Sequence, residues 1–131
     1  MSESSSPSMV YCLYSILDKQ GFITCLCSVT NTVDIYTVNG EFVTSYTNEH
    51  NISTIQYTHD GLCIMIGTTI GYLILLTNTG EEIGILDYTI HGGITCICDD
   101  ANMYVTYLGT DKGVLLALSD TEATNYFKYT M

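Results

Sequence analysis

Apolar stretches of strand length alternate with short polar breaks along almost the whole chain. Between residues 50 and 80, three such stretches are separated by the turn sequences Thr-His-Asp-Gly (58–61) and Gly-Thr-Thr-Ile-Gly (67–71). Apolar runs bounded by Gly, Asp and Asn are typical of β-strands joined by tight turns. No segment keeps an amphipathic helical pattern for more than a turn or two. The pattern therefore predicts an all-β protein.

The same pattern predicts three groups of strands. The Asn-Gly pair at residues 39–40 is a strong hairpin signal between the last two strands of the first group. The expected strands are 9–17, 22–27, 33–38 and 41–46; then 52–57, 62–66, 72–76 and 81–88; then 94–98, 103–108, 114–118 and 124–129.

These groups repeat at a nearly constant spacing. Residues 39–40, 79–80 and 119–120 are 40 residues apart and each pair follows an apolar run, while His50 and His91 are 41 residues apart. A four-stranded repeat of roughly 40 to 45 residues is typical of a WD40-like propeller blade. We therefore expect about three four-stranded antiparallel blades at residues 9–47, 48–88 and 89–131, after a disordered lead at residues 1–8.

Three blades form only a partial propeller, because closed propellers typically have about four to eight blades. Both flanks of the stack would stay open, and repeat units bury their faces only against neighbours. We therefore expect either self-association through the open blade edges or a terminal piece of a larger propeller.

The charge balance is strongly acidic. The chain has 14 Asp and Glu residues against three lysines and no arginine, which gives a formal net charge of -11. Such a chain repels phosphate backbones, so nucleic-acid binding is excluded and anionic membrane surfaces are disfavoured. The simplest interpretation of the acidity is that it keeps the protein soluble. The alternative is that it favours a protein partner with a basic surface.

The six cysteines point to core packing in a reducing compartment. Residues 1–8 have neither a basic start nor an apolar centre, so we expect no signal peptide, a cytoplasmic location and reduced thiols. Cys25 and Cys27, like Cys96 and Cys98, form C-x-C pairs whose sulfurs share one face of a strand, a spacing that also suits a soft metal. Because all four lie in apolar runs without a neighbouring histidine, we interpret them as buried core residues. No metal site and no cofactor are expected.

A membrane-spanning helix is a rival interpretation of residues 62–80, which carry no charge. Glycine, threonine and asparagine interrupt this segment where turns are expected, and no basic residues flank it. Two buried strands around a turn explain the segment better, so no transmembrane segment is expected.

Several residues resemble WD40 repeats. His50 precedes a strand that ends at an Asp-Gly turn (60–61), and residues 108–120 (LGTDKGVLLALSD) resemble a WD40 third strand with its preceding turn. The positions where such repeats often carry tryptophan are occupied here by Tyr36, Leu76 and Leu118. The chain has no tryptophan, so the family's His, Ser, Asp and Trp network cannot be complete.

The chain most resembles the C-terminal propeller of neurobeachin-like BEACH-domain proteins. The resemblance covers residues 21–45, with the hairpin IYTVNGEFVTS at 35–45, and then residues 53–80 and 92–129 with an aromatic tail. It implies a scaffold for protein-protein interactions in membrane trafficking, cytoplasmic or peripheral to vesicle membranes. The alternatives are a generic WD40 adaptor subunit of another complex, or a gene fragment with no independent activity.

An enzyme is not expected. The sequence has no G-x-S-x-G elbow, no phosphate-binding loop and no H-E-x-x-H motif. If the chain were an enzyme, its activity should be lost with His59→Ala or Asp60→Ala, whereas a scaffold would only have a loosened turn.

Binding residues are expected on the loops, because loops on a rigid scaffold carry function. Stacked sheets present two loop faces, and the turns after first and third strands form one of them. That face carries Asp18, Asn39, His59, Asp60, Asn78, Asp99, Asp100 and Asp120. The blade entries and middle turns form the other face, which we predict to bind a protein. Its candidate residues are Glu49, His50, His91, Asp111 and Lys112.

Overall fold

The computed structural model describes residues 12–17 (backbone only), 21–27, 30–58, 61–100, 102 and 105–119. These residues form strands and one short 3-10 helix, η1 (Thr89–His91). The strands are β1 (Cys12–Leu17), β2 (Phe22–Cys27), β3 (Thr32–Thr37), β4 (Phe42–Thr47), β5 (Ile52–Tyr57), β6 (Cys63–Thr68), β7 (Tyr72–Thr77), β8 (Glu82–Asp87), β9 (Ile94–Asp100), β10 (Val105–Thr110) and β11 (Leu115–Ser119).

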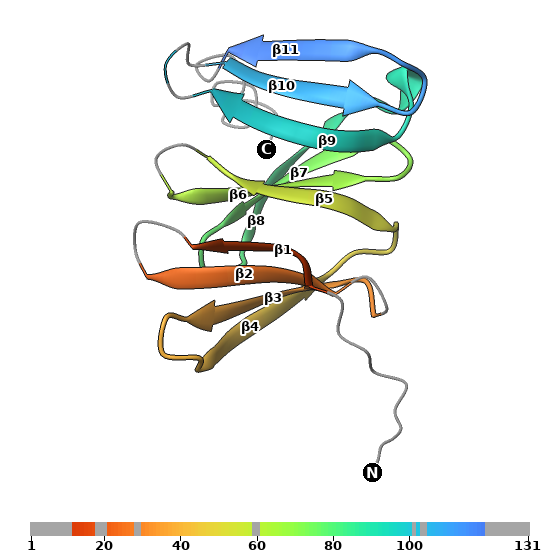
Figure 1. Ribbon diagram of the computed structural model, residues 1–131. Helices are drawn as coiled ribbons and strands as arrows, with labels where there is room; N and C mark the ends of the chain where they lie inside the picture. Colours follow the sequence, from red (N-terminus) through yellow and green to blue (C-terminus); the bar gives the residue numbers. More distant parts are fainter. Residues whose placement is uncertain are drawn as a thin grey trace.

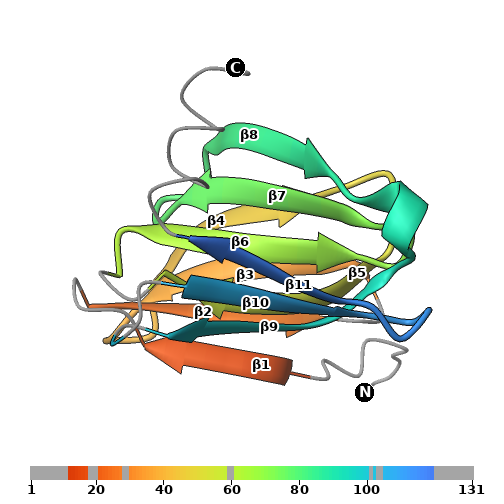
Figure 2. The same cartoon turned by 90° about the horizontal axis from the view of Figure 1, so that it is seen from above.

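The strands form three antiparallel sheets in which each strand pairs with the next one in the sequence. Blade 1 contains β1 to β4, blade 2 contains β5 to β8, and blade 3 contains β9 to β11. The sheets are stacked with blade 2 in the middle (Figure 1). Figure 2 views the stack from above and shows the connections between strands at the two ends of the strands. The all-β prediction is confirmed. Blade 3 has three described strands where four were predicted, and both residues 1–8 and the predicted strand 124–129 lie outside the described residues.

Four of the hairpins use the same local chemistry. At the β3–β4 hairpin, Gly40 has φ +87°, its N–H donates to the Thr37 carbonyl, and the Glu41 N–H donates to the Thr37 hydroxyl at 3.2 Å. A glycine in the left-handed region after a tight turn is typical of a bulged hairpin. The threonine and glycine pairs at the other three hairpins are Thr68 and Gly71, Thr77 and Gly80, and Thr110 and Gly113.

Gly67 lies inside β6, although the sequence predicted the start of a turn there. A Cβ built on Gly67 would lie 2.6 Å from Cγ2 of Ile94, the first residue of β9. This glycine is therefore needed where blade 3 packs against blade 2, and the strand continues through it to Thr68. The uncharged segment 62–80 accordingly forms two strands and a turn, and among the described residues no helix is long and apolar enough to cross a membrane.

Two apolar clusters hold the blades together. Between blades 1 and 2, Leu26, Val33 and Ile35 pack against aliphatic side chains of β5, β6 and β7. Between blades 2 and 3, Met65 and Leu73 pack against a second group from β9 and β10. Burial of each of these aliphatic side chains contributes about 1.5–3 kcal/mol to the free energy of folding. These clusters fix the stack and therefore the positions of its loops.

The cysteines of the two C-x-C pairs have different environments. Cys25 and Cys27 are buried, as predicted, whereas Cys96 and Cys98 are exposed. The core interpretation is wrong for the second pair, because these residues lie on the face of β9 that points away from blade 2. The structure also has Cys25 in a disulfide, which corrects the expectation of reduced thiols at this position.

Candidate protein-binding face

The five predicted binding residues lie on connections at one end of the stack, the right-hand end in Figure 1. Glu49 and His50 lie between β4 and β5, His91 lies in η1, and Asp111 and Lys112 lie in the β10–β11 turn. We call this end the connector face and define it by residues 48–51, 69–71, 88–93 and 111–113.

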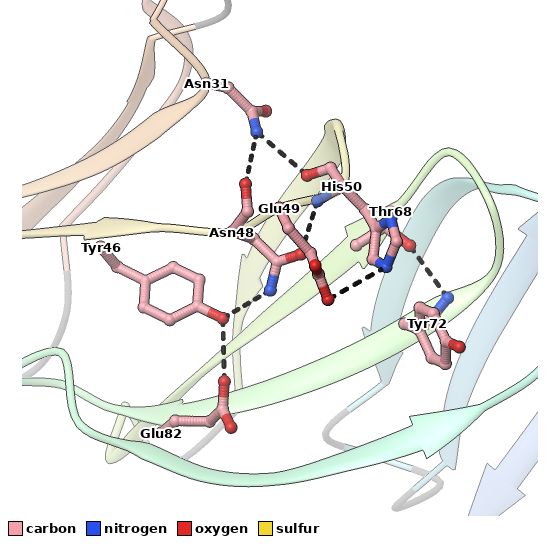
Figure 3. Close-up of polar contacts among 8 residues, drawn as sticks. All are labelled: Asn31, Tyr46, Asn48, Glu49, His50, Thr68, Tyr72 and Glu82. Carbon is pink, nitrogen blue, oxygen red and sulfur yellow. Dashed lines mark hydrogen bonds and ion pairs between the residues drawn. The ribbon is translucent and has the colours of Figure 1, made fainter.

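Asn31 holds the connection from blade 1 to blade 2 (Figure 3). Its side-chain nitrogen donates to the carbonyls of Asn48 and His50 at 3.1 and 3.0 Å, and its oxygen accepts from the Ile52 N–H at 2.7 Å. Asn31 has φ +56°, a left-handed conformation that asparagine tolerates. One polar side chain in the β2–β3 turn thus fixes the loop that carries Glu49 and His50.

His50 is half-buried and stacks on Tyr72, the first residue of β7, with ring centroids 5.4 Å apart. Its Nε2 lies 3.6 Å from a carboxylate oxygen of Glu49. The Glu49 side chain is 85% exposed, so its carboxylate is available to a partner while the histidine ring is fixed against blade 2.

The connection from blade 2 to blade 3 packs on the β6–β7 turn. Asp87 accepts hydrogen bonds from the Thr89 N–H at 2.9 Å and the Thr89 hydroxyl at 2.7 Å, and these bonds hold the pKa of the Asp87 carboxyl below its usual value. The Tyr88 N–H donates to the Gly71 carbonyl at 2.8 Å. A Cβ built on Gly71 would lie 2.6 Å from the Gly92 carbonyl oxygen, so the two segments are in close contact.

Asp111 ties the β10–β11 turn to the same connection. Its Oδ1 accepts from the Gly93 N–H at 2.9 Å, and its own N–H donates to the Gly93 carbonyl at 2.9 Å. Lys112, beside it, is exposed, while His91 is half-buried with its ring 6.4 Å from that of Tyr88. Glu49, Asp111 and Lys112 are therefore all exposed, but Asp111 is also held by hydrogen bonds within the face, and the two histidines are half-buried.

Two exposed isoleucines on the connector face were missed by the sequence analysis. Ile90 in η1 is 81% exposed and Ile70 in the β6–β7 turn is 42% exposed. They lie on neighbouring segments, because Gly71 packs closely against Thr89. The sequence does contain a signal for them, namely a branched aliphatic residue inside a turn sequence. Each isoleucine directly follows a threonine, and a glycine comes one or two residues later.

A polar chain beside the connector face joins blades 1 and 2 (Figure 3). The Asn48 side chain donates to the Tyr46 hydroxyl at 2.8 Å, and this hydroxyl donates to Glu82 at 2.9 Å. The pKa of Tyr46 is raised to about 12, chiefly by burial; the hydrogen bond from Asn48 lowers this pKa, and Glu82 contributes to raising it. Tyr46 thus crosses from the last strand of blade 1 to that of blade 2.

The remaining loop residues lie apart from this face. Asn39, Asn78, Asp99 and Asp100 lie on or beside connections at the opposite end of the strands. The other residues predicted for that loop face, Asp18, His59, Asp60 and Asp120, lie outside the described residues. Within the described residues, no three His, Cys, Asp or Glu side chains are grouped so that they could hold a metal ion.

No protein-family model matches the sequence, and no curated protein matches it. By fold, the chain is similar to a crystal structure of BBS1N in complex with ARL6DN, with a TM-score of 0.68 and 12% sequence identity. The match covers 83% of this chain and 34% of that chain, so this chain spans about a third of the structure that it matches. At this identity the likeness shows the fold alone, which is β-propeller-like.

Proposed function

We propose that this chain is a non-catalytic scaffold that binds a protein partner through the connector face. The observation that carries the proposal is the 81% exposure of Ile90 on a connection held by hydrogen bonds on both sides. A large apolar side chain on a fixed loop offers contact area at little cost in ordering. The similar BBS1N structure is itself a complex with a protein, which is consistent with this role.

The partner's chemistry follows from the side chains around Ile90. Ile70 extends the apolar surface, while Glu49 and the net charge of -11 favour a basic rim around an apolar pocket. Lys112 is the one exposed cation among the five predicted binding residues. Asp111 and the ring of His50 are occupied by contacts within the face, so we assign them to its stability.

A more specific form of this proposal is that the chain is a WD40-like scaffold of the BEACH type in membrane trafficking, located in the cytoplasm or at vesicle surfaces. Its support is the sequence resemblance, which includes the segment 35–45, and this segment forms the β3–β4 hairpin. A generic WD40 adaptor subunit is the alternative, and it uses the same face.

The test compares cross-linked partners of wild-type protein and the Ile90→Asp variant in cytosolic extract, identified by mass spectrometry. Ile85→Asp is the matched control, since Ile85 is also exposed but lies on β8 away from the connector face. We expect one or more specific partners to be lost with Ile90→Asp and kept with the control. Partners that are retained by both variants would contradict the proposal.

A further inference from the structure

One face of blade 3 is uncovered among the described residues. Gly109 pairs with Cys96 on β9 and with Leu115 on β11, and Tyr107 pairs in the same way with Cys98 and Ala117. This side is the reverse of the one that carries Ile97, Leu108 and Leu116 into the cluster with blade 2. Leu115 is 71% exposed, and both cysteines are exposed. We call this side the open flank of blade 3.

The open flank of blade 3 has the same strand register as the covered flank of blade 2. In blade 2, Gly67 pairs with Thr54 on β5 and with Leu73 on β7, and Met65 pairs in the same way with Gln56 and Leu75. Each of these residues lies 42 positions before its counterpart on blade 3 (54 and 96, 67 and 109, 73 and 115). Met65 and Leu73 are buried there because blade 3 packs over them.

The match extends to the groups that hold the next blade. Ile94, the first residue of β9, packs its side chain against Gly67, and its carbonyl accepts a hydrogen bond from the Ser53 hydroxyl. Gly109 and Thr95 occupy the corresponding positions on blade 3, and Thr95 is exposed. Blade 3 therefore presents the positions that correspond to the blade 2 surface on which blade 3 packs, with the same glycine and leucine at Gly109 and Leu115.

Blade 1 lies on the opposite side of blade 2 from blade 3 (Figure 1), and its outer flank carries two aromatic rings. Tyr36 and Phe42 form an edge-to-face pair with ring centroids 5.8 Å apart, and Phe42 is 60% exposed. Asp34 lies on the same side, where its carboxylate accepts from the Ser45 hydroxyl at 2.6 Å. This hydrogen bond partly satisfies the carboxylate if the flank becomes covered.

We propose that the open flank of blade 3 receives blade 1 of a second copy of this chain. Two copies related by a twofold axis would then form two identical seams and a ring of six blades, twice the three described here. Six lies within the range of roughly four to eight blades in closed propellers. Blade 1 is the natural occupant because it belongs to the same repeat as the blade that covers the corresponding surface of blade 2.

The first test is the solution mass of the full chain at micromolar concentration, by light scattering after size exclusion. We expect a dimer, with Phe42→Asp or Leu115→Asp each weakening dimerisation by roughly tenfold or more. Ile85→Asp, on the middle blade, should leave the mass unchanged. A folded wild-type monomer would overturn the proposal, as would a dimer that Phe42→Asp leaves intact, because the second result means that blade 3 pairs with itself.

Mixing the two variants tests the head-to-tail arrangement directly. The Leu115→Asp chain keeps an intact blade 1 flank and the Phe42→Asp chain keeps an intact blade 3 flank, so the mixture should regain one seam and form heterodimers. Failure of two folded variants to associate on mixing would overturn the proposal.

A third experiment uses only the wild-type protein, so it does not depend on the folding of any variant. Cys96 and Cys98, followed by peptide mass spectrometry, should react with a thiol reagent when the protein is dilute and be protected when it is concentrated, and equal labelling in a confirmed dimer would contradict the ring.

Discussion

The Oδ1 atom of Asp111 lies 2.9 Å from the backbone nitrogen of Gly93, and the Asp111 nitrogen lies 2.9 Å from the Gly93 oxygen. This reciprocal pair joins the β10–β11 turn to the connection that follows η1. A residue chosen from the sequence as a candidate for binding thus supports the face on which binding is proposed.

Removing the Asp111 carboxylate should therefore reduce stability. Asp111→Ala loses a charge-assisted hydrogen bond at an exposed position, so we expect the free energy of unfolding to fall by about 1 kcal/mol. Lys112→Ala is the neighbouring control, and its effect should stay within about 0.5 kcal/mol. Urea denaturation measures both, and equal effects would mean that the Asp111–Gly93 contact contributes nothing.

Asn31 should be more costly to replace, because its side chain makes three hydrogen bonds to the blade 1–blade 2 connection. We expect Asn31→Gly to lower the free energy of unfolding by about 2 kcal/mol. Asn31→Ala should cost about 1 kcal/mol more than Asn31→Gly, since φ is +56° and alanine disfavours that region. Indistinguishable glycine and alanine variants in the same urea titration would argue against the left-handed conformation.

Gly67→Ala tests the contact between blades 2 and 3. The added Cβ would lie 2.6 Å from Cγ2 of Ile94, and overpacking of this kind costs about 1–3 kcal/mol. Ile94→Ala removes the opposing atom, so the double variant should be more stable than the sum of the two single effects predicts. Strict additivity in a double-mutant cycle would show that the two residues do not oppose each other.

Alkaline pH should weaken the fold through Tyr46. Its pKa is raised from 10.0 to about 12 in the folded protein, so the folded state retains a proton that the unfolded state releases. The contribution of Tyr46 is therefore complete below pH 10 and declines as the pH rises toward 12. Tyr46→Phe should show a smaller loss of stability over this range, measured by urea titration at several pH values, and identical pH profiles would rule out the effect.

Local turn chemistry made most of the fold predictable. The Asn39-Gly40 pair correctly indicated a hairpin, because a glycine after a tight turn satisfies a backbone requirement that does not depend on distant residues. Gly67 is also a glycine, but it is required for a different reason, because the Ile94 side chain approaches it from the next sheet. That cause depends on tertiary packing, so the pattern around residue 67 wrongly indicated a turn.

Exposure was harder to predict than strand position. Cys98 lies in an apolar run like Cys27, yet Cys98 is exposed and Cys27 is buried; β2 lies inside its sheet, whereas β9 is an edge strand. The candidate face was located from the repeat, since connections at equal positions in each unit must lie at one end of a stack. Ile90 was missed because η1 has no repeat counterpart and no helical pattern in the sequence.

The pairing of every strand with its sequence neighbour affects how the chain can acquire its structure. Each sheet needs only contacts between residues close together in the sequence, so each can form before its neighbours are in place, at a low cost in loop closure. The long-range step is the docking of one preformed sheet on the next. We therefore expect substitutions at the threonine and glycine hairpins to slow folding, and substitutions between the sheets chiefly to speed unfolding.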